Sequence, residues 1–240
     1  MKDRFVPHKK QKVFAIVKPI FKLFFRRPKE IRSLTGEVPA RAILVANHAT
    51  KRGPMIYTLH LPTYHRPWGA HQMLGNYSSR FHYLRDVFYI QKRGFGRFRA
   101  TLLASFEAIF SILLYRGMRF LPTYHDTRFA KTIHASMKTL EADMQILVFP
   151  ENSEDGYRET INEFFPGFVV LAEHYRRRTG VDLPIYPIYY HEKLDKILIG
   201  EPDYAGKMAD AGLSRVEIAE EFRKKVNALC EQIVTESAAE

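Results

Sequence analysis

Two short apolar runs constrain the fold of this chain more than any other feature. Residues 42–46 (Ala-Ile-Leu-Val-Ala) and 146–149 (Ile-Leu-Val-Phe) are too short for core helices, and each runs directly into polar residues. Both runs therefore predict buried strands. They alternate with longer segments of helical spacing, which predicts the α/β class, with a mostly parallel central sheet flanked by helices on both faces.

Further elements fit this alternation. We expect helices over 98–116 and 168–178, strands at 184–189 and 196–199, and a last helix from Ser214. Ser214 is followed three residues later by Glu217, which is the pattern of a capping box.

Polar side chains follow both short runs at the points where the strands end. Asn47 and His48 follow the first run, and Glu151 follows the second. Because the carboxyl ends of parallel strands meet at one edge of a sheet, both ends can line a single cleft. A histidine beside a carboxylate and several cations suits general-base activation of a hydroxyl or amine. The residues alone thus predict a transferase or hydrolase that acts on an anionic substrate.

The positive charge is concentrated at the start of the chain. The formal net charge is +11, and residues 1–32 carry eleven Lys and Arg against Asp3 and Glu30. Residues 12–27 have a helical period with an apolar side (Val13, Val17, Ile20, Phe21, Phe24) and a basic side (Lys18, Lys22, Arg26). Such a helix favours a membrane interface, and the alternative is a capping helix with solvated lysines.

We therefore expect residues 1–35 to form a basic amphipathic membrane-interface segment and residues 36–240 to form a single domain. The most apolar stretch, Ala100 to Tyr115, contains Glu107 and falls short of the roughly 20 residues of a membrane span. It predicts a helix that is deeply buried or in partial contact with lipid. With no secretory signal and a single Cys230, we expect a cytoplasmic protein, peripheral on the inner face of the cell membrane.

Two other classes of ligand are not expected. His60, His65, His71 and His82 lack the spacing of zinc-binding motifs, so no metal site is predicted. Nucleic acid is not an expected partner, because the charge lies in a terminal amphipathic helix and not along an aromatic-studded sheet or groove.

Three ordered blocks resemble those of the glycerolipid acyltransferases, the 1-acylglycerol-3-phosphate (lysophospholipid) acyltransferase superfamily. The blocks are Asn47-His48, Phe149-Pro150-Glu151 and Leu183-Pro184-Ile185-Tyr186-Pro187, followed by Gly200-Glu201-Pro202, and the resemblance covers roughly residues 40–235. It implies a glycerolipid acyltransferase-like fold and a lipid acyltransferase without a resident cofactor. The acyl donor would be an acyl-CoA or acyl-carrier-protein thioester, and the acceptor a lysophospholipid or related lipid, with His48 as the general base.

The chain departs from the family pattern in its first and third blocks, and again in its second block. The family has an aspartate five residues after the histidine, where this chain has Gly53. Either Glu151, Asp126 or a backbone carbonyl orients His48, or the protein is slow or is a catalytically inactive lipid- or acyl-thioester-binding protein. The family's third block ends in an arginine, where this chain has Glu154, and a carboxylate cannot replace a bidentate phosphate clamp.

The resemblance also implies a set of substrate-binding residues. Lys51 and Arg52 lie beside the base, and His125 takes the place of an arginine in the family's second block. The expected substrate-binding residues are Asn47, Lys51, Arg52, His125, Glu151, Asn152, Ser153 and Gly167. The expected partners are an anionic membrane surface, the lipid acceptor and the acyl-CoA or acyl-carrier-protein donor.

Overall fold

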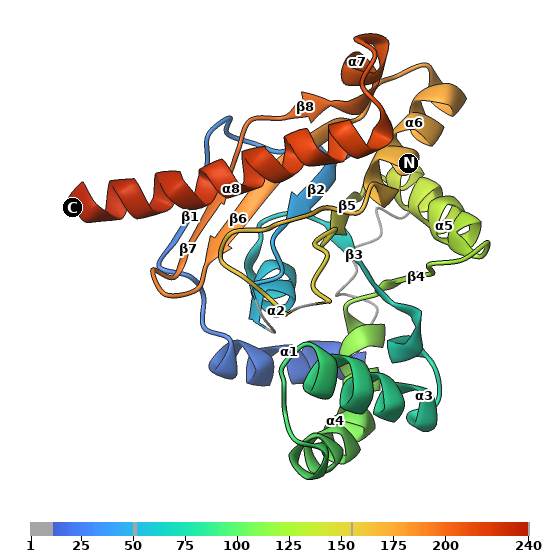
Figure 1. The fold of residues 1–240 in the computed structure, drawn as a ribbon, viewed down its shortest axis with the longest axis vertical. Coiled ribbons are helices and arrows are strands. Elements are labelled where there is room, and N and C mark those ends of the chain that lie inside the picture. Colours follow the sequence, from blue (N-terminus) through green and yellow to red (C-terminus); the bar gives the residue numbers. More distant parts are fainter. Residues whose placement is uncertain (1–11, 50–51, 155, 240) are drawn as a thin grey trace.

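The computed structural model describes residues 12–49, 52–154 and 156–239, with side chains described from residue 18 onward (Figure 1). Its eight strands form one sheet in the order β1-β7-β6-β2-β5-β3-β4, with β8 paired to β6. The strands are β1 (Glu30–Ser33), β2 (Ile43–Ala46), β3 (His65–Ala70), β4 (Leu121–Thr123), β5 (Gln145–Val148), β6 (Pro184–His191), β7 (Lys196–Ile199) and β8 (Asp203–Tyr204).

Helices precede the first strand, connect most of the parallel strands and follow the last strand. They are α1 (Lys12–Phe24), α2 (Arg52–His60), the 3-10 helix η1 (His71–Leu74), α3 (Tyr77–His82), the π-helix η2 (Tyr83–Gln91), α4 (Arg97–Gly117), α5 (Phe129–Glu141), α6 (Gly167–Thr179), α7 (Ala205–Asp210) and α8 (Arg215–Ala239). The predicted capping box is confirmed, because the Ser214 backbone N–H donates to Glu217 and the Glu217 N–H donates to Ser214 Oγ.

The sheet is mostly parallel, as expected. The central strand β2 pairs in parallel with β5 and β6, and the pairs β3–β5, β3–β4 and β1–β7 are parallel too. Only β7 and β8 run antiparallel to β6. The pair β6–β7 is antiparallel because a short turn after His191 joins the two strands directly, with no crossover helix between them.

Helices cover both faces of the sheet. Ile43 and Val45 of β2 point to the face that packs against α5, α6 and α8. Leu44 and Ala46 point to the opposite face, where they pack with Ile56 of α2 and its neighbours. Each residue of β2 thus contributes to one of two apolar cores. This explains why the strand is apolar throughout and does not alternate between apolar and polar residues.

Part of the segment 1–35 belongs to the sheet. Strand β1 pairs with β7 along its whole length, from Glu30 opposite Lys196 to Ser33 opposite Ile199. The backbone N–H of Lys29 also donates to the carbonyl of Asp195. The sheet domain therefore begins before residue 36, since β1 fills the outer edge of β7.

One end of the molecule is built from α1, α3 and α4, which gather below the sheet (Figure 1). The apolar helix expected over 98–116 is α4, which has 21 residues. By length and composition it is apolar enough to cross a membrane. The helix is longer than the apolar stretch 100–115, because it continues beyond it at both ends.

Candidate functional site

The end of β2 is held in place by the side chain of Asn47. This side chain is only 2% exposed. Its Nδ2 donates to the carbonyl of Tyr190 at 3.0 Å, and its Oδ1 accepts from the Tyr190 N–H at 2.9 Å and from the Tyr57 hydroxyl at 2.6 Å. Asn47 thereby extends the pairing of β2 with β6 by one residue. Its part in the site is to fix the backbone from which His48 projects.

The structure brings the two predicted strand ends together. β2 and β5 are neighbours in parallel register, so His48 and Glu151 follow the same edge of the sheet. The backbone N–H of His48 donates to Glu151 Oε2 at 3.1 Å. The carboxylate of Glu151, just after β5, is thus hydrogen-bonded to the backbone of His48, the candidate base just after β2.

Aromatic rings surround the imidazole of His48. The Tyr157 ring stacks on it with centroids 4.4 Å apart and planes 22° apart, and Phe149 lies at 5.4 Å with a tilted plane. Lys92, directly after η2, donates from Nζ to Ser153 Oγ at 2.7 Å and lies 5.4 Å from the centre of the Tyr157 ring. Lys92 therefore holds the loop after β5 over His48.

The charged groups beside His48 are buried. Burial raises the pKa of Glu151, and the backbone N–H groups of His48 and Arg158 and the charge of Lys92 act in the opposite direction. Burial lowers the pKa of Lys92, against the attraction of Glu151 and Glu154. Desolvation thus drives both groups toward their neutral forms, as is common for residues that exchange protons in an active site.

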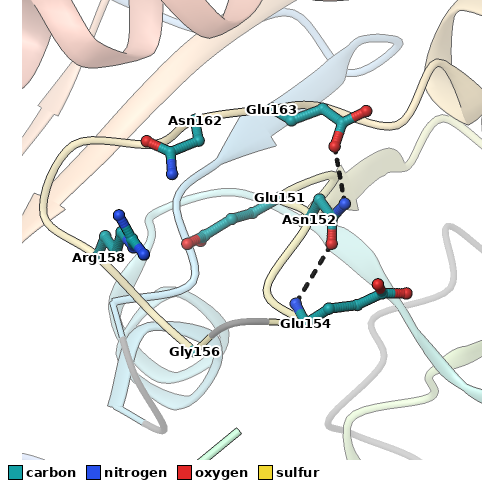
Figure 2. Close-up of a pocket in the computed structure, with 7 residues that line it drawn as sticks. All are labelled: Glu151, Asn152, Glu154, Gly156, Arg158, Asn162 and Glu163. Atoms are coloured by element: carbon teal, nitrogen blue, oxygen red, sulfur yellow. Dashed lines mark hydrogen bonds between the residues drawn. The ribbon is translucent and has the colours of Figure 1, made fainter.

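A small polar cavity of about 110 Å³ opens beside Glu151. Figure 2 shows the Glu151 and Arg158 side chains directed toward one another across it. On its other side, Asn152 Nδ2 donates to Glu163 Oε2 at 2.7 Å, and Asn152 Oδ1 accepts from the Glu154 N–H. The full lining is Glu151, Asn152, Glu154, Gly156, Arg158, Asn162 and Glu163. With three carboxylates and one guanidinium, this cavity suits a small hydroxylated or cationic group better than a phosphate.

Arg52 and His125 lie on exposed segments. Arg52 begins α2, and its Nε is 3.7 Å from Glu192 Oε1. His125 lies in the loop after β4 with its ring edge-on to Phe165, at 6.3 Å between centroids. Lys51 lies outside the described residues.

Ser153 and Gly167 have structural partners. Ser153 accepts the hydrogen bond from Lys92 described above. Gly167 is the first residue of α6, and a Cβ there would lie 3.1 Å from Phe129 and 3.4 Å from Trp68. Gly167 thus allows α6 to pack closely against these two rings.

Gly53 leaves no room for a side chain. A Cβ built on Gly53 would lie 2.3 Å from the carbonyl oxygen of His48 and 3.2 Å from the Cβ of Ala49. The family's aspartate therefore cannot be accommodated at this position unless the backbone turn moves.

Asp126 is engaged elsewhere. The Arg128 guanidinium donates to both of its carboxylate oxygens, and these hydrogen bonds lower the pKa of Asp126 to about 2. Glu151 is hydrogen-bonded to the backbone N–H of His48.

The sequence gives no sign of Lys92, Tyr157 or Arg158 as site residues. Lys92 lies 61 residues from its partner Ser153, and Tyr157 and Arg158 lie in a loop without regular spacing. These contacts depend on how η2 and the loop after β5 fold against each other. Among the described residues, no group of three or more His, Cys, Asp or Glu side chains is placed to hold a metal ion.

Comparisons with known proteins find similarity at the level of structure. No protein-family model matches the chain, and a search of curated proteins finds no match. The structure is similar to the crystal structure of the 1-acyl-sn-glycerophosphate acyltransferase PlsC from Thermotoga maritima, with a TM-score of 0.49 and 15% sequence identity. The match covers 100% of this chain and 85% of that one. At these values the similarity assigns neither a family nor an activity to this chain.

We predict that placing a side chain at position 53 destabilises the fold. Gly53→Ala and Gly53→Asp should each lower the free energy of unfolding by about 1–3 kcal/mol, as for other overpacked positions. Urea denaturation measures this loss. Gly96→Ala is the matched control, because nothing lies within 4 Å of a Cβ there. A Gly53→Asp variant as stable as the native chain would show that the turn adapts.

We also predict a pH-dependent effect of Glu151→Gln. The pKa of Glu151 is raised above its ordinary value of 4.5, so the folded state holds this proton more tightly than the unfolded state does. This contribution to stability is fully present below pH 4.5 and is lost as the pH rises through the folded-state pKa. Relative to the native chain, Glu151→Gln should therefore gain stability as the pH rises from 4.5 to neutrality.

Urea unfolding of both proteins across this pH range tests the prediction, with the exposed Glu37→Gln as the control. A stability difference between Glu151→Gln and the native chain that is constant with pH would contradict the raised pKa.

Proposed function

We propose that this chain is a membrane-associated acyltransferase that moves a fatty acyl group from an acyl-CoA or acyl-carrier-protein thioester to a lysophospholipid or related lipid acceptor. The observation that supports this most is the hydrogen bond between the His48 backbone and Glu151 at neighbouring parallel strand ends. These residues belong to the Asn-His and Phe-Pro-Glu blocks that resemble those of glycerolipid acyltransferases.

In the proposed reaction His48 removes the proton from the acceptor hydroxyl. The oxygen forms a bond with the thioester carbonyl carbon, and the carbon–sulfur bond then breaks. The departing thiolate takes the proton from His48, so the base is regenerated and the products are an ester and a free thiol. Cys230 takes no part in this sequence.

The acceptor headgroup is proposed to bind in two places. The cavity beside Glu151 has Glu154 where the family has an arginine, and it suits the hydroxyl-bearing part of the headgroup. The phosphate is proposed to bind outside it, and the expected ligands are Lys51, Arg52 and His125. This arrangement predicts an acceptor that is bound differently from a simple glycerol phosphate.

Helix α1 is proposed to bring the protein to the inner face of the cell membrane. Ile20, Leu23 and Phe24 are exposed on it, whereas Phe21 and Phe25 pack against the body of the protein. Exposed apolar residues next to Lys22 and Arg26 fit the interface of an anionic bilayer.

A second candidate is a catalytically inactive protein that binds lipid or acyl thioester. It is favoured by the contact that excludes a side chain at Gly53 and by the Tyr157 ring stacked on His48. Neither feature prevents the binding of a lipid or an acyl thioester. Both disfavour catalysis, because the imidazole lacks the family's aspartate and has a ring stacked on it.

We predict that purified protein releases free thiol from a long-chain acyl-thioester in the presence of lysophospholipid. His48→Ala should lower this rate by about 10²- to 10⁴-fold, the usual contribution of a general base. The exposed His134 on α5 provides the control, since His134→Ala should leave the rate unchanged. A thiol-reactive dye measures the release.

Two results would contradict the proposal. If the native protein releases no thiol with any acceptor in a broad lipid panel, the binding protein becomes the better description. If His48→Ala and His134→Ala are equally active, His48 is not the base.

A further inference from the structure

Helix α4 has its large apolar side chains on the outside. Its protein-facing side is made of small residues, with Ala100, Ala104 and Ala108 completely buried. The large side chains point outward, with Phe98 86% exposed and Phe106 68% exposed. A surface helix of a water-soluble protein has the opposite arrangement. Small residues against protein and large ones outside are typical of helices in contact with lipid.

Two polar groups in the middle of α4 are bound on its inner side, and its exposed arginines lie near the helix ends. Glu107, its one acidic residue, accepts a hydrogen bond from the Tyr89 hydroxyl of η2 at 2.5 Å. Buried Arg80 of α3 donates from Nε to the Ala108 carbonyl at 2.9 Å. Glu107 and the Ala108 carbonyl thus have partners inside the protein, and between Arg99 and Arg116 the exposed side chains of α4 are all apolar.

Helix α1 continues this apolar surface. It contacts α4, and the two helices lie at the same end of the molecule (Figure 1). We call the surface the α1–α4 face and define it by the exposed side chains Ile20, Leu23, Phe24, Phe98, Leu102, Leu103, Phe106, Ile109, Phe110 and Leu113. Clusters of exposed apolar side chains on neighbouring helices mark interaction sites.

Basic residues flank the α1–α4 face in the sequence. Residues 92–119 contain six Lys and Arg and a single acid, Glu107. Lys22 and Arg26 are exposed on and just after α1. Anionic lipid headgroups complement this charge. A second copy of the chain fits less well, because two such faces would bring like charges together.

We propose that the α1–α4 face embeds in one leaflet of an anionic bilayer, with α4 lying in the plane of the membrane. Because α3 and η2 pack along the inner side of α4, only its outer side is open to lipid, which suits an interfacial helix and not a spanning one. The inference does not depend on acyl transfer, since it concerns where the protein binds and not what it catalyses.

Vesicle flotation of the full chain tests the proposal with 1:1 phosphatidylcholine–phosphatidylglycerol vesicles. Leu102→Glu/Phe106→Glu should bind at least about tenfold more weakly than the native chain, since two exposed apolar anchors are lost. The control is Val216→Glu/Val234→Glu, which changes two exposed apolar residues of α8 and should bind normally. Equal binding of both double variants would overturn the proposal. A second result would also overturn the proposal: the native chain does not bind vesicles but forms a dimer in sedimentation, and Leu102→Glu/Phe106→Glu abolishes that dimer.

The fluorescence of a tryptophan placed on the α1–α4 face gives a second measurement, with a substitution that keeps a large apolar side chain at that position. Emission from Phe106→Trp should shift to the blue on vesicles and be quenched most by lipids brominated near the headgroup. Val216→Trp should not respond. Strongest quenching by bromines at the bilayer centre would contradict the in-plane orientation. Thiol release assayed in detergent, without vesicles, separates failure of this inference from failure of the proposed function.

Discussion

The candidate site depends on how the carboxyl end of β2 is held between its two neighbours. Asn47 binds both backbone groups of Tyr190 on β6, and one residue later the His48 N–H binds Glu151 at the end of β5. A buried amide without partners costs about 1–3 kcal/mol, so these contacts fix the backbone strongly. The direction of the His48 side chain follows from this double attachment.

The sequence predicts the sheet and the pairing of the two strand ends for a simple physical reason. Apolar runs such as 43–46 have to be buried on both faces, and parallel strands end at a common edge. Strand β3 is not predictable in the same way, because His65, Pro67 and Gly69 carry no strand pattern. Lys92 and Tyr157 reach the site through tertiary contacts, which local spacing does not encode. A helix that is apolar nearly all round, such as α4, has the same pattern in a core or against lipid, and only its exposure in the fold separates the two.

The apolar end of the molecule and the candidate site are structurally connected. η2 packs against α4, and Lys92 directly after η2 binds Ser153 in the loop over His48. A protein bound to a bilayer through the α1–α4 face would therefore have one helical layer between the lipid and this loop. The same loop carries Tyr157, whose ring stacks on the imidazole of His48.

The central claim is that His48, presented at the end of β2, acts as a base in acyl transfer to a lipid. The most direct measurement follows a labelled acyl chain from an acyl-thioester into lipid, on vesicles that contain lysophospholipid. The account predicts labelled diacyl product with the native chain and essentially none with a folded His48→Ala variant. Equal amounts of product from both proteins would contradict it.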